Sequence, residues 1–427
     1  MIVIALLVLA MVLLVVGAEM FLVMGIPTLL IKHQFFAGLP DLIVGQRLIG
    51  GVEVVTLMAI PFFIFAAEIM AKGRMANDLG TLVRVMVGSV RGGIAYSTVI
   101  GNMAFGAASG SAPATVAAMG RMAYPELRKN GYSEKFSLGL IASSAECALL
   151  IPPSISFVVY SWLTGTSIAK LFAAGLGIGI VLGLAFMVLA TIETVRNKID
   201  VPSETASEER LAAIGRALWV IGLQTIMMGG IFGGFFTATE AAAVSVVYAA
   251  VVEVLVLRSI SLRDFYAIAK SSAVSTSVIF ILLAMGSLLA YFLTLSGVDA
   301  WVLRQIKESG IHWGFFLLLV NVVFVIAGMF LDPNSMMLIF LPTLFPVAVA
   351  LGVDPVHFGV IVVMNVCIGM ITPPFGLDLF VTAGTLRRPV EAVIAGIAPF
   401  VVANLVTLAL VSYIPELSTT LPRLMGL

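Results

Sequence analysis

Residues 328–376 read GMFLDPNSMMLIFLPTLFPVAVALGVDPVHFGVIVVMNVCIGMITPPFG and contain two long apolar runs, each interrupted by proline. The first run breaks at Leu331-Asp332-Pro333 and the second at Thr372-Pro373-Pro374. Proline removes a backbone donor and clashes with the preceding turn, so a helix stops at each place. In a bilayer such a break survives only inside protein or beside a polar cavity. The stretch therefore predicts a helical hairpin followed by a broken membrane helix.

A second copy of this design lies upstream, in FGAASGSAP at residues 105–113 and LLIPPS at residues 149–154. Moving Pro152-Pro153 forward by 221 residues reaches Pro373-Pro374, and the same shift places Ser111 on Asp332. Pro113 falls one residue out of register with Pro333. Interrupted hydrophobic segments at matching places in two halves point to the binding site of a secondary transporter. We expect hairpins over residues 94–124 and 312–350, and broken helices over 136–163 and 359–383.

The composition places the chain in the membrane. Its 427 residues are 61% hydrophobic and 11% charged, against about 45–50% and about 25% in soluble domains. The zero net charge suggests no nucleic-acid partner. Cys147 and Cys367 lie in apolar runs and are too few for a disulfide framework. Without HxxxH or CxxC spacings, we expect neither a transition metal nor an enzyme, and no organic cofactor.

The distribution of basic residues predicts the orientation. Residues 1–31 contain no Lys or Arg, and we interpret them as one retained helix with an external N-terminus. The basic loops 121–135 and 196–198 belong on the cytoplasmic side, whereas loop 351–358, with no Lys or Arg, belongs outside. The two hairpins then open to opposite faces. The predicted fold is an all-α polytopic membrane protein: an inverted repeat with two re-entrant hairpins and two broken transmembrane helices.

Seven motifs resemble one family in order along nearly the whole chain, and residues 328–385 resemble it closely. That family is the large membrane subunit of tripartite ATP-independent periplasmic (TRAP) transporters. The motifs are AIPFF at 59–63, SGS at 109–111, IPPS at 151–154, FTATEAAA at 236–243, LDP at 331–333, DPVHFG at 354–359 and GMITPPFG at 369–376.

The resemblance implies a sodium-driven importer of organic acids, such as C4-dicarboxylates or sialic acids, in the bacterial inner membrane. Its partners would be a periplasmic substrate-binding protein and a small four-helix membrane subunit, here a separate chain. The family is similar to elevator-type carriers, in which a transport domain slides against a scaffold. We expect scaffold at residues 1–45, 167–257 (with a polar linker at 200–210) and 386–427, and transport domain at 46–166 and 258–385.

Sodium prefers oxygen ligands, and a broken helix supplies free carbonyls near its negative C-terminal end. The candidate sodium ligands are residues at the second hairpin and the second break, together with the residues that the 221-residue shift places opposite them in the first half. They are Gly328, Gly369, Thr372 and Phe375 in the second half, and Ala107, Ala148, Ile151 and Ser154 in the first half. An alternative is that the small residues simply allow close helix packing.

Hydroxyl and carboxyl groups near the hairpin tips are the candidate substrate residues: Ser109, Ser111, Glu146 and Asp332. Asp332 is alternatively the N-cap of the second hairpin arm, accepting from the N–H groups of residues 334 and 335. Glu146 lies in SSAECA at 143–148, where the family usually has small residues. It could accept hydrogen bonds at the transport site, be protonated, or pair with a base.

Three other functions stay open. A free-standing sodium–carboxylate elevator symporter would need no binding protein. A channel would not show saturable, sodium-dependent uptake. A membrane enzyme or anchor would leave the repeat unexplained.

The hairpin arms, at about 15–18 residues, are shorter than the roughly 20 needed to cross. We therefore expect the two tips to meet near the midplane, and the block holding them to move as a unit.

Overall fold

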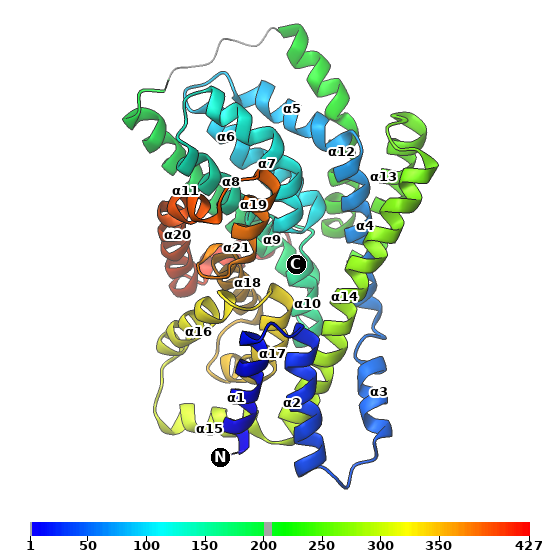
Figure 1. The fold of residues 1–427 in the computed structure, drawn as a ribbon, viewed down its shortest axis with the longest axis vertical. Coiled ribbons are helices and arrows are strands. Elements are labelled where there is room, and N and C mark those ends of the chain that lie inside the picture. The colour runs from blue at the N-terminus through cyan, green and yellow to red at the C-terminus, as the bar shows by residue number, and fades with distance from the viewer. Residues whose placement is uncertain (1, 200–206) are drawn as a thin grey trace.

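The computed structural model describes residues 2–199 and 207–427, and these residues form helices and turns with no β-strand (Figure 1). The predicted all-α membrane fold is confirmed. Within the described residues, seven helices are long and apolar enough to cross a membrane, or up to eight if one bent pair counts as a single span.

Element bounds in the two halves follow the 221-residue repeat. The hairpin arms α7 (Ala112–Lys129) and α17 (Pro333–Ala350) begin and end at equivalent positions. The first half also contains the 3₁₀ turn Val55–Met58, α4 (Ala59–Lys72), α5 (Met75–Val87), α6 (Gly93–Ser109), α8 (Glu134–Ala145), α9 (Cys147–Leu150), α10 (Ile155–Thr164) and α11 (Ile168–Arg196). The second half contains α12 (Ser207–Phe232), α13 (Ala238–Ala250) with a π-helical turn at Val251–Val256, α14 (Leu262–Leu295), α15 (Val298–Glu308), α16 (Trp313–Gly328), α18 (Pro355–Ile371), α19 (Leu377–Leu386), α20 (Val390–Tyr413) and α21 (Glu416–Leu424).

The N-terminal segment differs from the sequence expectation. A single helix through residues 1–31 is wrong, because α1 ends at Val15 and α2 spans Met20–Phe35. Gly17 adopts φ 82°, a left-handed conformation that glycine accepts and that ends a helix. The following helix, α3 (Leu42–Gly50), falls in the segment expected at the interface.

The predicted polar linker at 200–210 also needs adjustment. Residues 200–206 lie outside the described residues, and α12 already begins at Ser207. The two glutamates that follow Ser207 in the sequence are typical of a helix start, because acidic residues in the first turn favour the positive end of the helix dipole. Residues 207–210 therefore belong to a helix.

The broken helices form the centre of the molecule. Every residue of α18 from Val356 to Ile371 is buried, as is every residue of α8 from Phe136 to Ala145. Figure 1 shows α6 and α7 toward one end of the long axis and α16 and α17 toward the other, with α9 and α18 between them. The hairpins thus approach the centre from opposite ends.

Two long helices, α11 and α20, pack tightly on the broken helices. A Cβ added to Gly396 of α20 would lie 2.0 Å from the Lys135 carbonyl oxygen, and one added to Gly139 of α8 would lie 2.2 Å from the Gly396 oxygen. A Cβ added to Gly175 of α11 would lie 2.4 Å from the Leu150 oxygen. Glycine is required at these positions because backbone approaches backbone directly.

Candidate functional site: the paired helix breaks

The first break separates α9 from α10. The helix axis turns by 40° between Glu134–Leu150 and Ile155–Thr164, and the peptide bond Pro152–Pro153 is cis. Ser154 bridges the gap: its hydroxyl donates to the Leu149 carbonyl oxygen at 2.5 Å and accepts from the Phe157 N–H at 3.4 Å. The hydroxyl of this sodium-ligand candidate therefore holds the two half-helices together.

The second break separates α18 from α19, and Pro373–Pro374 is also cis. The Thr372 hydroxyl donates to the Ile368 carbonyl oxygen at 2.5 Å, which orients the hydroxyl and leaves oxygen lone pairs for an ion. The Gly369 carbonyl oxygen accepts from the Thr372 N–H at 3.1 Å. The Phe375 side chain is exposed, and its ring centroid lies 5.8 Å from that of Phe330 in the tip of the second hairpin.

Each hairpin rests on the break of its own half through small residues. A Cβ added to Gly369 would lie 2.6 Å from the Gly328 Cα. In the first half a Cβ added to Gly106 would lie 2.5 Å from the Ala148 Cβ. The structural equivalent of Gly328 is therefore Gly106 and not the sequence candidate Ala107, because the first hairpin has one more residue between this contact and its cap.

The tip of the first hairpin reaches the proline pair itself. A Cβ added to Gly110 would lie 2.5 Å from the Pro153 carbonyl oxygen, and Gly110 has φ 59°, so this position requires glycine. The neighbouring Ser109 is buried, and its hydroxyl lies 3.1 Å from that of Thr115. The contact between Gly110 and Pro153 therefore places Ser109, the residue before Gly110, close to the first break.

Ser111 and Asp332 occupy equivalent capping positions. The Asp332 carboxylate accepts from the Asn334 and Ser335 N–H groups at 3.0 and 3.2 Å, as the N-cap interpretation requires. The Ser111 hydroxyl accepts from the Ala114 N–H at 3.5 Å. Each cap fixes the N-terminus of a hairpin arm, whose positive dipole end then faces the break.

Buried amides that the sequence analysis missed connect each hairpin to its broken helix. Asn102 Nδ2 donates to the Ser144 hydroxyl at 2.7 Å in the first half, and Asn365 Nδ2 donates to Asn321 Oδ1 at 2.8 Å in the second. Ser144 and Asn365 are equivalent in the repeat. A signal was available, because polar side chains inside apolar membrane runs are functional candidates by default.

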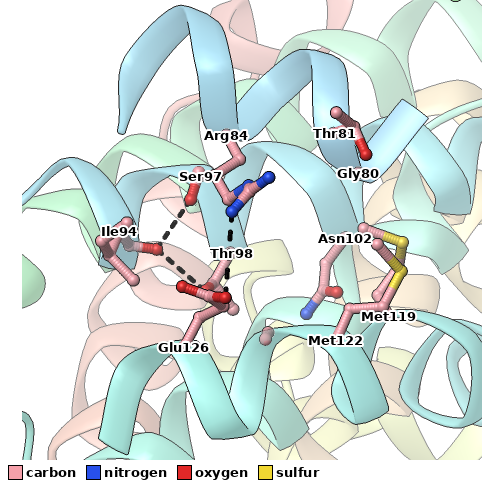
Figure 2. A pocket seen from close by; sticks show the side chains of 11 residues that line it. Gly80, Thr81, Arg84, Ile94, Ser97, Thr98, Asn102, Met119, Met122 and Glu126 are labelled. Atoms are coloured by element: carbon pink, nitrogen blue, oxygen red, sulfur yellow. Dashed lines mark hydrogen bonds and ion pairs between the residues drawn. The ribbon is translucent and has the colours of Figure 1, made fainter. Parts of the chain in front are cut away.

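A cavity of about 270 Å³ adjoins the first half of the site, between α5, α6 and α7. Figure 2 shows Arg84 and Glu126 facing each other across it, with Nη1 and Oε1 3.8 Å apart. Thr98 and Asn102 also line it. Asn102 is hydrogen-bonded to Ser144 of α8, so the cavity lies beside both the first hairpin and the first broken helix. Its lining offers the polar side chains of Arg84, Thr98 and Glu126 to a small hydrated solute.

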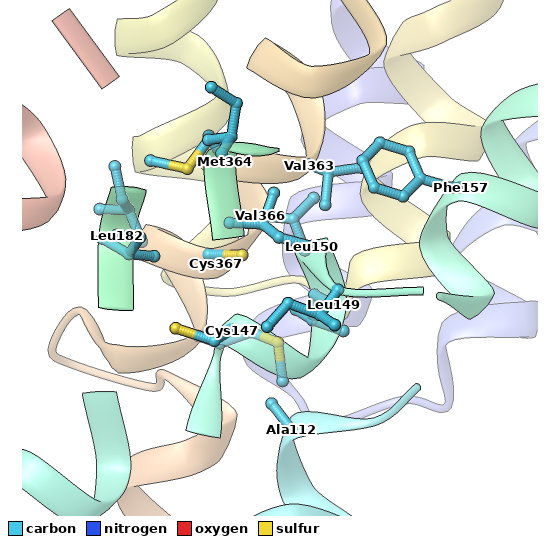
Figure 3. Packing of buried hydrophobic residues seen from close by; sticks show 14 of the residues in the cluster. Ala112, Cys147, Leu149, Leu150, Phe157, Leu182, Val363, Met364, Val366 and Cys367 are labelled. Atoms are coloured by element: carbon cyan, nitrogen blue, oxygen red, sulfur yellow. The ribbon is translucent and has the colours of Figure 1, made fainter. Parts of the chain in front are cut away.

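The first-half residue Glu146 is completely buried. Asn404 Nδ2 donates to its Oε2 at 3.2 Å, and its Oε1 has no hydrogen-bond partner. Among the described residues Glu146 forms no ion pair. Figure 3 shows the adjacent Cys147, and Cys367 of α18, packed among buried aliphatic side chains. Both cysteines are free and buried, as predicted.

Comparison with known proteins gives a consistent result. Residues 7–417 match the family model described as the tripartite ATP-independent periplasmic transporter, DctM component. The chain is 37% identical over 407 residues to the ectoine TRAP transporter large permease protein TeaC of Halomonas elongata, covering 95% of each chain. It is 40% identical over 372 residues to the C4-dicarboxylate TRAP transporter large permease protein DctM of Pseudomonas aeruginosa, covering 87% of each. The solved structure of the Alcanivorax borkumensis YdaH transporter is similar in fold, with TM-score 0.60 and 12% identity over 90% of this chain and 87% of that one.

Proposed function

The chain belongs to the family of TRAP transporter large permeases, and from this membership we propose that it carries small organic acids inward by sodium-driven secondary transport. Members of this family are transport proteins and not enzymes. The chain is a multi-pass protein of the bacterial inner membrane.

The observation that carries the proposal is the paired contact of a hairpin with a helix break. In both halves a small residue near the hairpin tip touches a small residue just before a Pro-Pro pair: Gly106 against Ala148, and Gly328 against Gly369. In the second half the Gly328 carbonyl oxygen lies 3.0 Å from the position of a Cβ on Gly369, so a hairpin carbonyl lies beside the broken helix. Backbone oxygens at such breaks suit a hard cation. We therefore propose one sodium site at each break, with Gly106 replacing Ala107 in the first.

The hairpin arms that begin at the two tips also suit an anionic substrate. The N-termini of α7 and α17 carry positive dipole ends, and bound sodium ions would add positive charge beside a carboxylate. The named substrates of the two relatives above are ectoine and C4-dicarboxylates, both small carboxylates. We propose a substrate of this size class, and the sialic acid type stays a prediction.

Transport by this chain would need two partners. We propose that a periplasmic binding protein delivers the substrate and that a small membrane subunit packs on this chain. In support, the outer faces of α12 and α14 are apolar and exposed in the isolated chain, for example at Leu218, Val274 and Val278. Lipid and a helical membrane partner both fit such a face.

We propose that the two hairpins and broken helices move as one block. The close backbone packing of α11 and α20 on the broken helices argues that these two helices move with them. This revises the expected scaffold at residues 167–257 and 386–427. The proposed scaffold is then α1–α5 and α12–α15, which also moves α4, α5, α14 and α15 out of the transport domain expected at residues 46–166 and 258–385. It contacts the block where Gly286 of α14 packs on Leu338 of α17.

Reconstitution tests the proposed function. Proteoliposomes containing this chain, its small membrane subunit and its binding protein should take up radiolabelled substrate, with ectoine and succinate as first probes. Omitting the binding protein or the small subunit should abolish uptake. Robust uptake by the chain alone would instead support the free-standing sodium–carboxylate symporter.

A further inference from the structure

Two carboxylates, Glu146 and Asp378, are completely buried in the middle of the molecule without a cationic partner. Asp378 lies in the first turn of α19, directly after the second break, and neither of its oxygens has a hydrogen-bond partner. Glu146 receives one hydrogen bond, from Asn404. In the described part of the chain, neither carboxylate takes part in a salt bridge.

The two carboxylates belong to one cluster. Glu146 caps the C-terminus of α8 and Asp378 lies in α19. The helices α8 and α19 pack on each other and on α20, which supplies Asn404. The thiol of Cys367 in α18 lies 3.6 Å from the backbone carbonyl oxygen of Glu146.

Two buried hydroxyls indicate that the cluster holds a ligand. Ser143 precedes Glu146 by one helical turn and Thr382 follows Asp378 by one, so each shares a helix face with its carboxylate. Both are completely buried, and neither hydroxyl has a hydrogen-bond partner among residues 2–199 and 207–427.

Neighbouring hydroxyls behave differently. Ser144 donates to the Leu140 carbonyl oxygen at 2.6 Å, and Thr407 donates to that of Ala403 at 2.9 Å. This back-bonding is the usual solution for a buried hydroxyl on a helix. Ser143 and Thr382 do without it, so their oxygens are free for another partner.

We propose that Glu146, Asp378, Ser143, Thr382 and Asn404 form a binding site for a sodium ion, separate from the two sites at the hairpin contacts. The unpartnered oxygens are Glu146 Oε1, both carboxylate oxygens of Asp378, Ser143 Oγ, Thr382 Oγ1 and Asn404 Oδ1. Two unpaired carboxylates in a membrane interior are strongly unfavourable, and a sodium ion bound between them offsets one of the two charges and is attracted by both. A hard cation with oxygen ligands also satisfies the two hydroxyls.

Other occupants fit less well. A shared proton would neutralise one carboxylate but leave Ser143 and Thr382 without partners. A substrate group needs a cavity, and neither the 270 Å³ cavity nor a second one of about 520 Å³ is lined by these residues. Glu146, a substrate candidate by sequence, is thereby reassigned to an ion. The inference rests on the proposed sodium-driven transport and adds a cation to it.

The test combines a binding readout with a flux readout. For binding, the midpoint temperature of thermal unfolding of the purified chain is measured as NaCl replaces choline chloride at constant ionic strength. The variants are Thr382→Val and Asp378→Asn in the cluster, with Thr407→Val as matched control. We expect the sodium concentration for half-maximal stabilisation to rise roughly tenfold in Thr382→Val, in the range seen when metal-site partners are removed. Thr407→Val should match the wild type.

For flux, the ratio of ²²Na⁺ to substrate taken up is measured in proteoliposomes with the complete set of subunits. Asp378→Asn should carry one sodium ion fewer per substrate than the wild type. If Asp378→Asn does not fold, Thr382→Val provides the same test through its sodium affinity. An unchanged ratio together with unchanged sodium affinity would overturn the site.

Two further outcomes would also contradict the site. Variants that alter only the pH dependence would assign a proton, and variants that alter only the substrate KM would assign substrate. A wild type without any sodium dependence would instead refute the proposed function itself, so the two failures are distinguishable.

Discussion

The Cys367 thiol lies 3.6 Å from the backbone carbonyl oxygen of Glu146, and these two residues are equivalent positions of the two repeats, 221 residues apart. A contact between equivalent residues lies on the axis that relates two repeats. The two broken helices therefore cross at that axis, immediately before their Pro-Pro pairs. The axis is chemically asymmetric, since one half contributes a carboxylate and the other a thiol.

The contact between Gly328 and Gly369 leaves no room for a side chain at either position. In Gly369→Ala the new methyl group would meet the Gly328 backbone at 2.6–3.0 Å. We expect destabilisation of about 1–3 kcal/mol, typical of overpacking, together with weaker sodium binding. Gly384→Ala is the control, because a Cβ there has open space. Equal thermal stability of the two variants would contradict the close contact.

The role of Asp332 as a cap predicts which substitutions are tolerated. Asp332→Ala removes the acceptor for two N–H groups and should lower stability by about 0.5–2 kcal/mol. Asp332→Ser retains a capping oxygen and should recover most of the loss in a denaturation experiment. A serine variant with normal stability but no uptake would show that the carboxylate also contacts substrate or ion.

Thr372→Val tests the second break while preserving side-chain shape. The variant removes one oxygen and the bond to Ile368, and we expect normal folding with a several-fold higher sodium concentration for half-maximal uptake. Thr407→Val, also at a buried back-bonded threonine, serves as the comparison. Sodium dependence identical to wild type would exclude Thr372 as a ligand.

Movement of the block can be tested by crosslinking in a background lacking Cys147 and Cys367. Gly286 is in direct contact with Leu338, with 2.8 Å between an added Cβ and the Leu338 Cβ, so cysteines at this pair should join scaffold to block once the two helices separate slightly to the Cβ–Cβ distance of a disulfide, about 3.5–4.5 Å. Locking them should stop uptake. Cysteines at Gly183 and Met103 should join α11 to α6 without inhibition, since both helices belong to the block. Full crosslinking of the first pair with normal uptake would contradict the block movement.

The breaks could be predicted from sequence because proline acts locally. Pro152-Pro153 and Pro373-Pro374 interrupt apolar runs whatever surrounds them. The end of α1 was missed because Gly17 inside an apolar segment is a weak signal that a buried helix also tolerates. The 221-residue shift pairs Gly328 with Ala107, whereas the structure pairs it with Gly106. The first hairpin has one more residue in its turn, and a constant shift along the sequence cannot account for such an insertion.

The carboxylate cluster depends on contacts between distant residues. Glu146 and Asn404 are 258 residues apart, and their hydrogen bond is set by how α8 packs on α20. The sequence showed Glu146 as a departure from the family pattern but contained nothing that paired it with Asp378. Only the packing of α8, α19 and α20 brings these groups together.

The most direct test of the account is uptake driven by a sodium gradient alone. Proteoliposomes with the complete set of subunits are loaded with potassium buffer and diluted into sodium or choline buffer at equal ionic strength and pH. The account predicts transient accumulation of substrate above its external concentration in sodium, and none in choline. Equal accumulation in the two buffers would contradict sodium coupling at the paired helix breaks.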